Sequence, residues 1–187
     1  WTINADKITL THSAITIHTP GDTMAIKAGI GSLIVNAADI NLSTQQYQVG
    51  SIEWLKGSIH FDNNMEEPVD GLDPNHIALT DIHLAADSIL YSEALTHAVI
   101  RKMSMKEKSG LKLDQLYASL TMDSTDVDMP TLLIRTPYSE IMGKAKVSIK
   151  VADETQSGPF DIHLFGSIGK GGVMAICGSM PKAFINR

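Results

Sequence analysis

The sequence predicts an all-β fold, and three observations support this prediction. Apolar and polar residues alternate through most of the chain, clusters of Gly, Pro, Asn and Asp interrupt the alternation, and helical spacing of apolar residues is rare. The clearest run spans residues 141–151, where small or apolar residues occupy the odd positions and three lysines lie between them. This pattern is typical of a half-buried strand with one apolar face and one charged face.

The other expected strands repeat this alternation over shorter runs, separated by turn-forming segments such as 108–110. From these breaks we expect ten to thirteen strands and little helix. In chain order, the apolar runs are Ile15 with Ile17, Ile40 with Leu42, Ile82 with Leu84, Ile89 with Tyr91, Leu116 to Met122, and Leu132 with Ile134.

Length and charge limit the classes of function. The 187 residues carry a formal net charge of −6 and no basic run, which argues against nucleic acid as the main partner. We expect one elongated β domain over residues 1–187, with the loop at 62–75 as a possible sub-boundary. Because the chain begins at Trp1 rather than Met and short motifs recur along it, we expect it to be an internal part of a longer, repeat-like protein.

The sequence contains no nucleotide-binding, metal-binding or nucleophile motif, so we expect no cofactor, no metal and no catalysis. The strongest enzymatic alternative rests on the carboxylates of Asp123, Asp126 and Asp128, which could act on a polysaccharide. Three carboxylates at the end of a strand are more simply explained as a solvated turn.

An apolar sheet face must be hidden from water. With little helix, the sheet can pack on a second sheet, coil into a solenoid, or curl into a trough that binds an apolar ligand. Apolar residues make up 43% of the chain but aromatic residues only 5%, so the hidden surface is mostly aliphatic. Such a lining suits acyl chains and an ordinary sandwich core equally well.

Residues 75–187 resemble the periplasmic portion of TamB-like proteins of the AsmA-like superfamily, in the form found in Bacteroidota. Related blocks recur between the strands of that family. The two clearest blocks are Lys106-Glu107-Lys108-Ser109-Gly110-Leu111 and Leu133-Ile134-Arg135-Thr136-Pro137-Tyr138-Ser139.

The resemblance implies a rolled antiparallel or mixed sheet that forms a taco-like trough with an apolar interior. Such proteins are periplasmic and are held in the inner membrane by a segment that this chain does not contain. They pass phospholipids toward the outer membrane, or help to assemble it with a barrel partner that would be met by regions outside these residues. The family has no active site to carry over.

On this hypothesis, phospholipid acyl chains bind passively to inward-facing aliphatic residues. We also expect edge-to-edge self-association, because strands at the edges of such a sheet are unpaired. The alternative is a structural or adhesive solenoid or sandwich that binds an envelope protein or a glycan, with Tyr117 and Tyr138 as contacts. The candidate groove-lining residues are Ile15, Ile17, Ile40, Leu42, Ile82, Leu84, Leu120, Leu132, Ile134, Val147 and Ile149.

Overall fold

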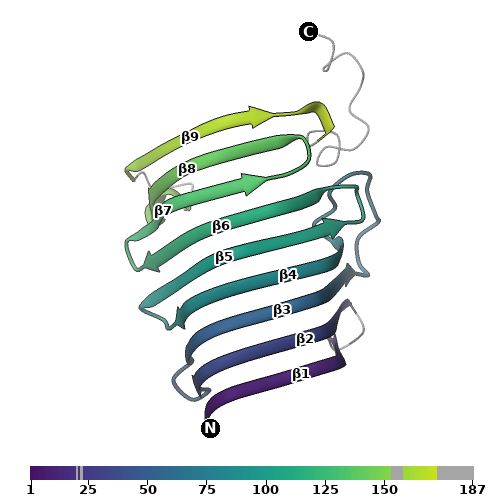
Figure 1. The fold of residues 1–187 in the computed structure, drawn as a ribbon, viewed down its shortest axis with the longest axis vertical. Coiled ribbons are helices and arrows are strands. Elements are labelled where there is room, and N and C mark those ends of the chain that lie inside the picture. The colour runs from purple at the N-terminus through teal and green to yellow at the C-terminus, as the bar shows by residue number, and fades with distance from the viewer. Residues whose placement is uncertain (20, 22, 153–157, 172–187) are drawn as a thin grey trace.

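The computed structural model describes residues 1–19, 21, 23–152 and 158–171. Over these residues the chain forms one nine-stranded sheet in which the spatial order of the strands is their order in the sequence (Figure 1). Every pair of neighbouring strands is antiparallel. The all-β prediction is therefore confirmed, and the option of a mixed sheet is resolved as antiparallel.

The strands shorten along the sheet from 17 or 18 residues to 9. They are long, so the described residues form nine strands instead of the ten to thirteen expected. The strands are β1 (Thr2–His18), β2 (Met24–Asn41), β3 (Gln46–Asn63), β4 (His76–Tyr91), β5 (Leu95–Glu107), β6 (Lys112–Asp123), β7 (Asp126–Arg135), β8 (Ser139–Ser148) and β9 (Phe160–Ile168).

Side-chain acceptors close several of the hairpin turns. Between β2 and β3, the side-chain oxygen of Asn41 accepts hydrogen bonds from the backbone N–H groups of Ser43 and Thr44. Between β6 and β7, Asp123 accepts bonds from the backbone N–H groups of Thr125 and Asp126. These are local turns of the kind that Asn and Asp favour.

The Lys-Glu-Lys-Ser-Gly-Leu block forms the turn between β5 and β6, and its glutamate has a structural role. The buried Glu107 carboxylate accepts hydrogen bonds from the N–H of Ser109 and from the N–H of Ala78 in β4. Burial alone would raise the pKa of Glu107, but the hydrogen bonds outweigh it and lower the pKa. Gly110 follows with a φ of 92°, a conformation that favours glycine. The block therefore ties this turn to a third strand.

The long loop between β3 and β4 is organised by a buried carboxylate. Asp73 accepts hydrogen bonds from the backbone N–H groups of Val69 and Asn75, and its carboxylate lies 3.0 Å from Nδ1 of His76. These bonds, that from Val69 foremost, lower the pKa of Asp73. Asp62 of β3 is paired with His76 of β4 directly beside the loop, so the sheet continues without a break across the expected sub-boundary.

The sheet forms a single layer, and few of its apolar side chains are buried. Among the described residues, seven apolar residues are buried and four of them are alanines, whereas twenty large apolar residues are exposed. Figure 1 shows an open sheet with no second layer packed on it. The apolar interior of a closed core is thus absent from this part of the chain, and the sheet is neither closed nor strongly curled.

The strand expected over residues 141–151 is shorter than predicted. Strand β8 ends at Ser148, and a turn of 3-10 helix follows over Ile149–Ala152. The backbone N–H of Ile149 donates a hydrogen bond to the carbonyl of Thr125 in the preceding turn, which draws the chain out of the ladder. Ile149 therefore does not continue the alternation of β8, and its predicted place in a strand was wrong.

Candidate functional site

The strand register places apolar side chains in rows that cross the entire sheet. Partners that lie opposite each other in an antiparallel pair project on the same face. Two rows cross all nine strands and contain no polar side chain. The first is Ile8, Val35, Ile52, Ala86, Ile100, Ala118, Leu132, Gly143 and Leu164, and the second is Leu10, Leu33, Trp54, Leu84, Met103, Leu116, Ile134, Ile141 and Gly166.

A third row also crosses all nine strands. It lies nearer to the end of the sheet at which β1 begins, and it contains one threonine among apolar residues. Within it, the rings of Tyr47 and Tyr91 stack with their centroids 5.5 Å apart. The longer strands β1 to β4 carry two further apolar rows toward their other end. We call the side of the sheet that carries these five rows the apolar face. The added rows are Ile3, Ile40, Tyr47, Tyr91, Thr96, Met122, Val127, Val147 and Phe160; Ile15, Ala28, Ile59 and Leu79; and Ile17, Ile26, Phe61 and Ile77.

Left-handed residues inside the strands keep these rows on one face. The apolar positions of β1 to β4 advance by two residues but in places by three, which in a regular strand would move the side chain to the opposite face. Five non-glycine residues with positive φ lie within these three-residue steps. A side-chain contact supports the arrangement, because the indole of Trp54 covers the space above Gly57, three residues later. The five residues are His12, Ala37, Lys56, Asp81 and Ser88.

The opposite side of the sheet, which we call the polar face, carries ion pairs between neighbouring strands. The guanidinium of Arg101 in β5 bridges Asp87 of β4 and lies 3.8 Å from Glu53 of β3. Lys106 Nζ lies 2.8 Å from the Asp81 carboxylate, and this contact lowers the pKa of Asp81 and raises that of Lys106. These charged side chains of the polar face therefore have partners of opposite charge on neighbouring strands. The five rows of the apolar face contain no charged side chain.

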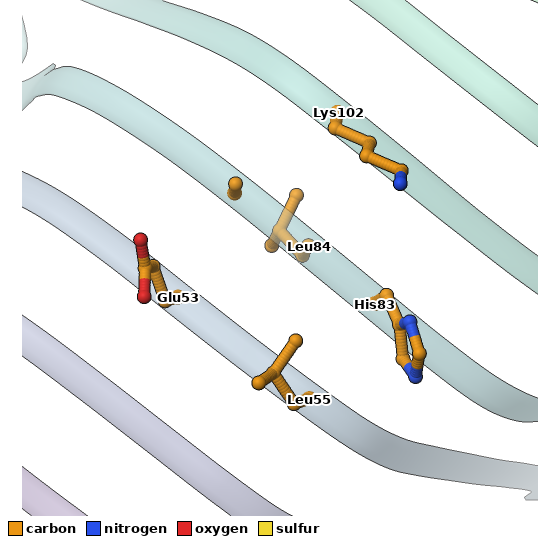
Figure 2. Close-up of a pocket in the computed structure, with 6 residues that line it drawn as sticks. Glu53, Leu55, His83, Leu84 and Lys102 are labelled. Carbon is orange, nitrogen blue, oxygen red and sulfur yellow. The ribbon is translucent and has the colours of Figure 1, made fainter.

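The polar face is only shallowly hollowed. Figure 2 shows a depression where Glu53, His83 and Lys102 project from three consecutive strands, while Leu84 lies behind the translucent ribbon. Its volume is about 200 Å³, below the range of about 300–1,000 Å³ that is usual for a small-molecule site. A wider depression of about 510 Å³ surrounds the Lys106–Asp81 pair and is open to solvent. Neither resembles an enclosed pocket.

Nine of the eleven predicted lining residues lie in strands and on the apolar face. Their environments differ widely, from Ile82, which is 1% exposed, to Ile17, which is 55% exposed. Leu42 follows the end of β2, where its backbone N–H donates to the carbonyl of Trp1. Ile149 lies in the 3-10 turn. The nine are Ile15, Ile17, Ile40, Ile82, Leu84, Leu120, Leu132, Ile134 and Val147.

Sequence reasoning missed the middle of the apolar face in the first three strands. The spacing of the apolar pairs along the sequence could have revealed these positions. Each pair begins three residues after the last apolar-face position of the preceding pair. The missed pairs are Ile8 with Leu10, Leu33 with Val35, and Ile52 with Trp54.

The three aspartates of the enzymatic alternative lie near one lysine, Lys146, at the end of the sheet that holds the turn between β6 and β7. Asp123 accepts hydrogen bonds from Thr125 and Asp126, which lower its pKa. Asp126 lies 3.5 Å from Lys146, and Asp128 is the strand partner of Lys146. Within the described part of the chain, no group of three or more His, Cys, Asp or Glu side chains could hold a metal ion.

Comparison of the chain with protein-family models, with curated proteins and with solved structures finds no match. The described residues also include no helical segment with the length and hydrophobicity needed to cross a membrane.

Proposed function

We propose that this chain is a periplasmic lipid-binding segment of an envelope-spanning protein, which moves phospholipids toward the outer membrane or helps to assemble it. One observation carries the proposal: an apolar face crosses nine strands without interruption, and no protein layer covers it in the described residues. Large exposed apolar surfaces mark binding sites for membranes, lipids or proteins.

The shape and chemistry of the apolar face favour acyl chains over more specific ligands. Nine strands spaced by about 4.8 Å give a surface about 38 Å long in the stacking direction. Its two complete rows hold aliphatic side chains, one tryptophan and no charged group, so they offer an acyl chain contact area without hydrogen bonds. Each methylene that leaves water gains about 0.8 kcal/mol, so ten of them gain about 8 kcal/mol before ordering costs.

The mechanism of this proposal is passive. Acyl chains lie along the rows, and the charged headgroup stays in water at the open margin of the sheet. Because successive strands add similar apolar side chains to each row, an acyl chain can shift along a row from one strand to the next. It does not have to leave a deep binding site. The polar face, with its ion pairs between strands, stays in water.

A photoreactive phospholipid tests this proposal directly. The protein is incubated with vesicles that contain phosphatidylethanolamine with a photoreactive group on one acyl chain, and adducts are mapped by mass spectrometry. We expect adducts on residues of the apolar face and few on the polar face. Equal labelling of both faces, or no labelling above a water-soluble probe of the same reactivity, would contradict the proposal.

A matched pair of variants adds a second test. Leu132 lies on the apolar face, and its neighbour Thr131 lies on the polar face opposite Ser119. Leu132→Asp places a carboxylate among the acyl chains and should reduce lipid uptake at least tenfold, whereas Thr131→Asp should leave it within twofold. Circular dichroism checks that both variants keep their β-sheet content. Equal losses in the two variants would show that the apolar face is not the lipid site.

One observation favours the alternative of a protein-binding role. The polar face has an apolar row over β6 to β9 that consists of Tyr117, Leu133, Met142 and Phe165, and Phe165 is 69% exposed. Tyr138, the other predicted contact, lies in the turn between β7 and β8 and is exposed. Absence of lipid labelling on both faces would favour this alternative.

A further inference from the structure

The outer edges of β1 and β9 differ from the rest of the sheet because no described strand pairs with them. An edge strand presents unpaired N–H and C=O groups to any extended chain that reaches it. Proteins usually protect such edges with lysines, prolines, kinks or charged residues on the apolar face.

The two edges of this sheet are protected to different degrees. Strand β1 has charged residues at Asp6 and Lys7 and a left-handed residue at His12. Strand β9 has no lysine, arginine or proline and no non-glycine residue with positive φ. Its two titratable side chains, Asp161 and His163, lie 2.7 Å apart, and Asp161 also lies 3.9 Å from Lys144 of β8. The edge of β9 is therefore open to another strand.

The apolar face of β9 carries large apolar side chains, whereas its polar face mixes Phe165 with Asp161, His163 and Ser167. Phe160, Ile162 and Leu164 belong to the apolar face, and Phe165 ends the apolar row on the polar face. Phe160 is 70% exposed and Ile168 is 68% exposed. Large apolar side chains that are this exposed along an unpaired sheet edge favour a further strand beside them.

We infer that β9 pairs antiparallel with β9 of a second copy of this chain, around a two-fold axis at Leu164. The pattern of β9 is self-complementary in this register. On the apolar face, Phe160 meets Ile168 of the second copy and the two Leu164 side chains meet each other. On the polar face, His163 meets Phe165 of the second copy. Every pair keeps residues of the same face opposite one another, as an antiparallel ladder requires.

The consequence concerns the apolar face as a whole. A two-fold axis perpendicular to the sheet leaves the apolar faces of both copies on the same side. The dimer then presents one apolar face of eighteen strands, nine from each copy. This inference does not depend on the lipid proposal, since the pairing can be measured in lipid-free protein.

A single cysteine at the axis tests both the pairing and its register. The native Cys177 lies outside the described residues and is replaced by serine in all variants. In an antiparallel pair, facing Cα atoms lie about 4.5–5.5 Å apart, within the range that a disulfide spans. Leu164→Cys should therefore form a disulfide-linked dimer on mild oxidation. Ile162→Cys should not, because the two copies of residue 162 would lie four residues apart along the strands, about 13 Å.

Sedimentation equilibrium of the unmodified chain should give a mass twice the monomer value of 20.2 kDa, and Phe165→Lys should shift it toward the monomer. Leu10→Cys in the opposite edge strand is the control for the choice of edge. A monomer at all concentrations, equal crosslinking at residues 162 and 164, or crosslinking at residue 10 would each overturn the inference. Species larger than a dimer would also overturn it, because they require pairing between unlike edges.

Discussion

Adding one methyl group at Gly31 should destabilise the sheet, because Gly31 faces a residue of the neighbouring strand that has a left-handed backbone conformation. Gly31 of β2 lies opposite Lys56 of β3, whose φ is 53°. A Cβ atom at Gly31 would lie 2.7 Å from Cβ of Lys56 and 2.8 Å from the carbonyl oxygen of Leu55. Both atoms are fixed to the backbone, so neither can rotate away.

The expected magnitude follows from two opposing terms. Overpacking of this kind costs about 1–3 kcal/mol, and replacing glycine by alanine recovers about 0.4–1 kcal/mol through the unfolded state. The Gly31→Ala variant should therefore lose about 1–2 kcal/mol of unfolding free energy. For a chain of this length, each 1 kcal/mol corresponds to about 2–4 °C in the melting temperature.

Urea unfolding followed by circular dichroism measures this loss, and the same strand provides a matched control. A Cβ atom at Gly29 would contact the hydroxyl of Ser58 first, and that hydroxyl can rotate aside. Gly29→Ala should therefore lose clearly less free energy than Gly31→Ala. Adding Lys56→Gly to Gly31→Ala should restore part of the loss, since it removes the facing Cβ. The reasoning fails if Gly31→Ala is as stable as the parent, or if both alanine variants lose the same amount.

Two further predictions concern single buried groups. The buried Nε1 of Trp54 has no hydrogen-bond partner, and an unpaired buried donor costs about 1–3 kcal/mol. Trp54→Phe should therefore unfold at the same urea concentration as the parent or a higher one; a clear loss would contradict this and show that the packing of the indole over Gly57 outweighs the unpaired donor. The folded-state pKa of Glu107 lies below its ordinary value of 4.5, so its ionised form stabilises the fold above that pH and the contribution is lost as the pH falls through the folded pKa. Glu107→Gln should lower the melting temperature at pH 7 and make it less dependent on pH between 5 and 3; an unchanged pH profile would contradict this.

The sequence was sufficient to predict the fold class and much of the apolar face, because alternation is a local property. Ile40, Ile82 and Ile134 lie where period-two alternation puts them within their own short runs. The pairing of neighbouring runs in chain order also follows from short turns between antiparallel strands. What alternation could not provide is the relation between one run and the next.

That relation depends on backbone conformations that the residue types do not reveal. Glycine and, to a lesser degree, Asn, Asp and His are the residues expected at positive φ. Here the positions in β1 to β3 are His12, Ala37 and Lys56, and neither alanine nor lysine indicates such a conformation. Each three-residue step between apolar pairs therefore resembled a break between two strands, which explains why more than nine strands were expected. The glycines that face these positions, such as Gly31 opposite Lys56, are a better signal than the left-handed residues themselves.

The number of three-residue steps in a strand follows the tapering of the sheet. Strands β1 to β4 contain two such steps each, β5 to β7 contain one, and β8 and β9 contain none, while strand length falls from 17 or 18 residues to 9. A regular strand twists steadily, so a long one would turn part of its apolar row away from that of its neighbours. A bulge or left-handed residue changes the twist locally and brings the apolar side chains back to the same face. A longer strand needs more of these corrections. The broad part of the apolar face at β1 to β4 thus needs two corrections in each strand, whereas the narrow part at β8 and β9 needs none.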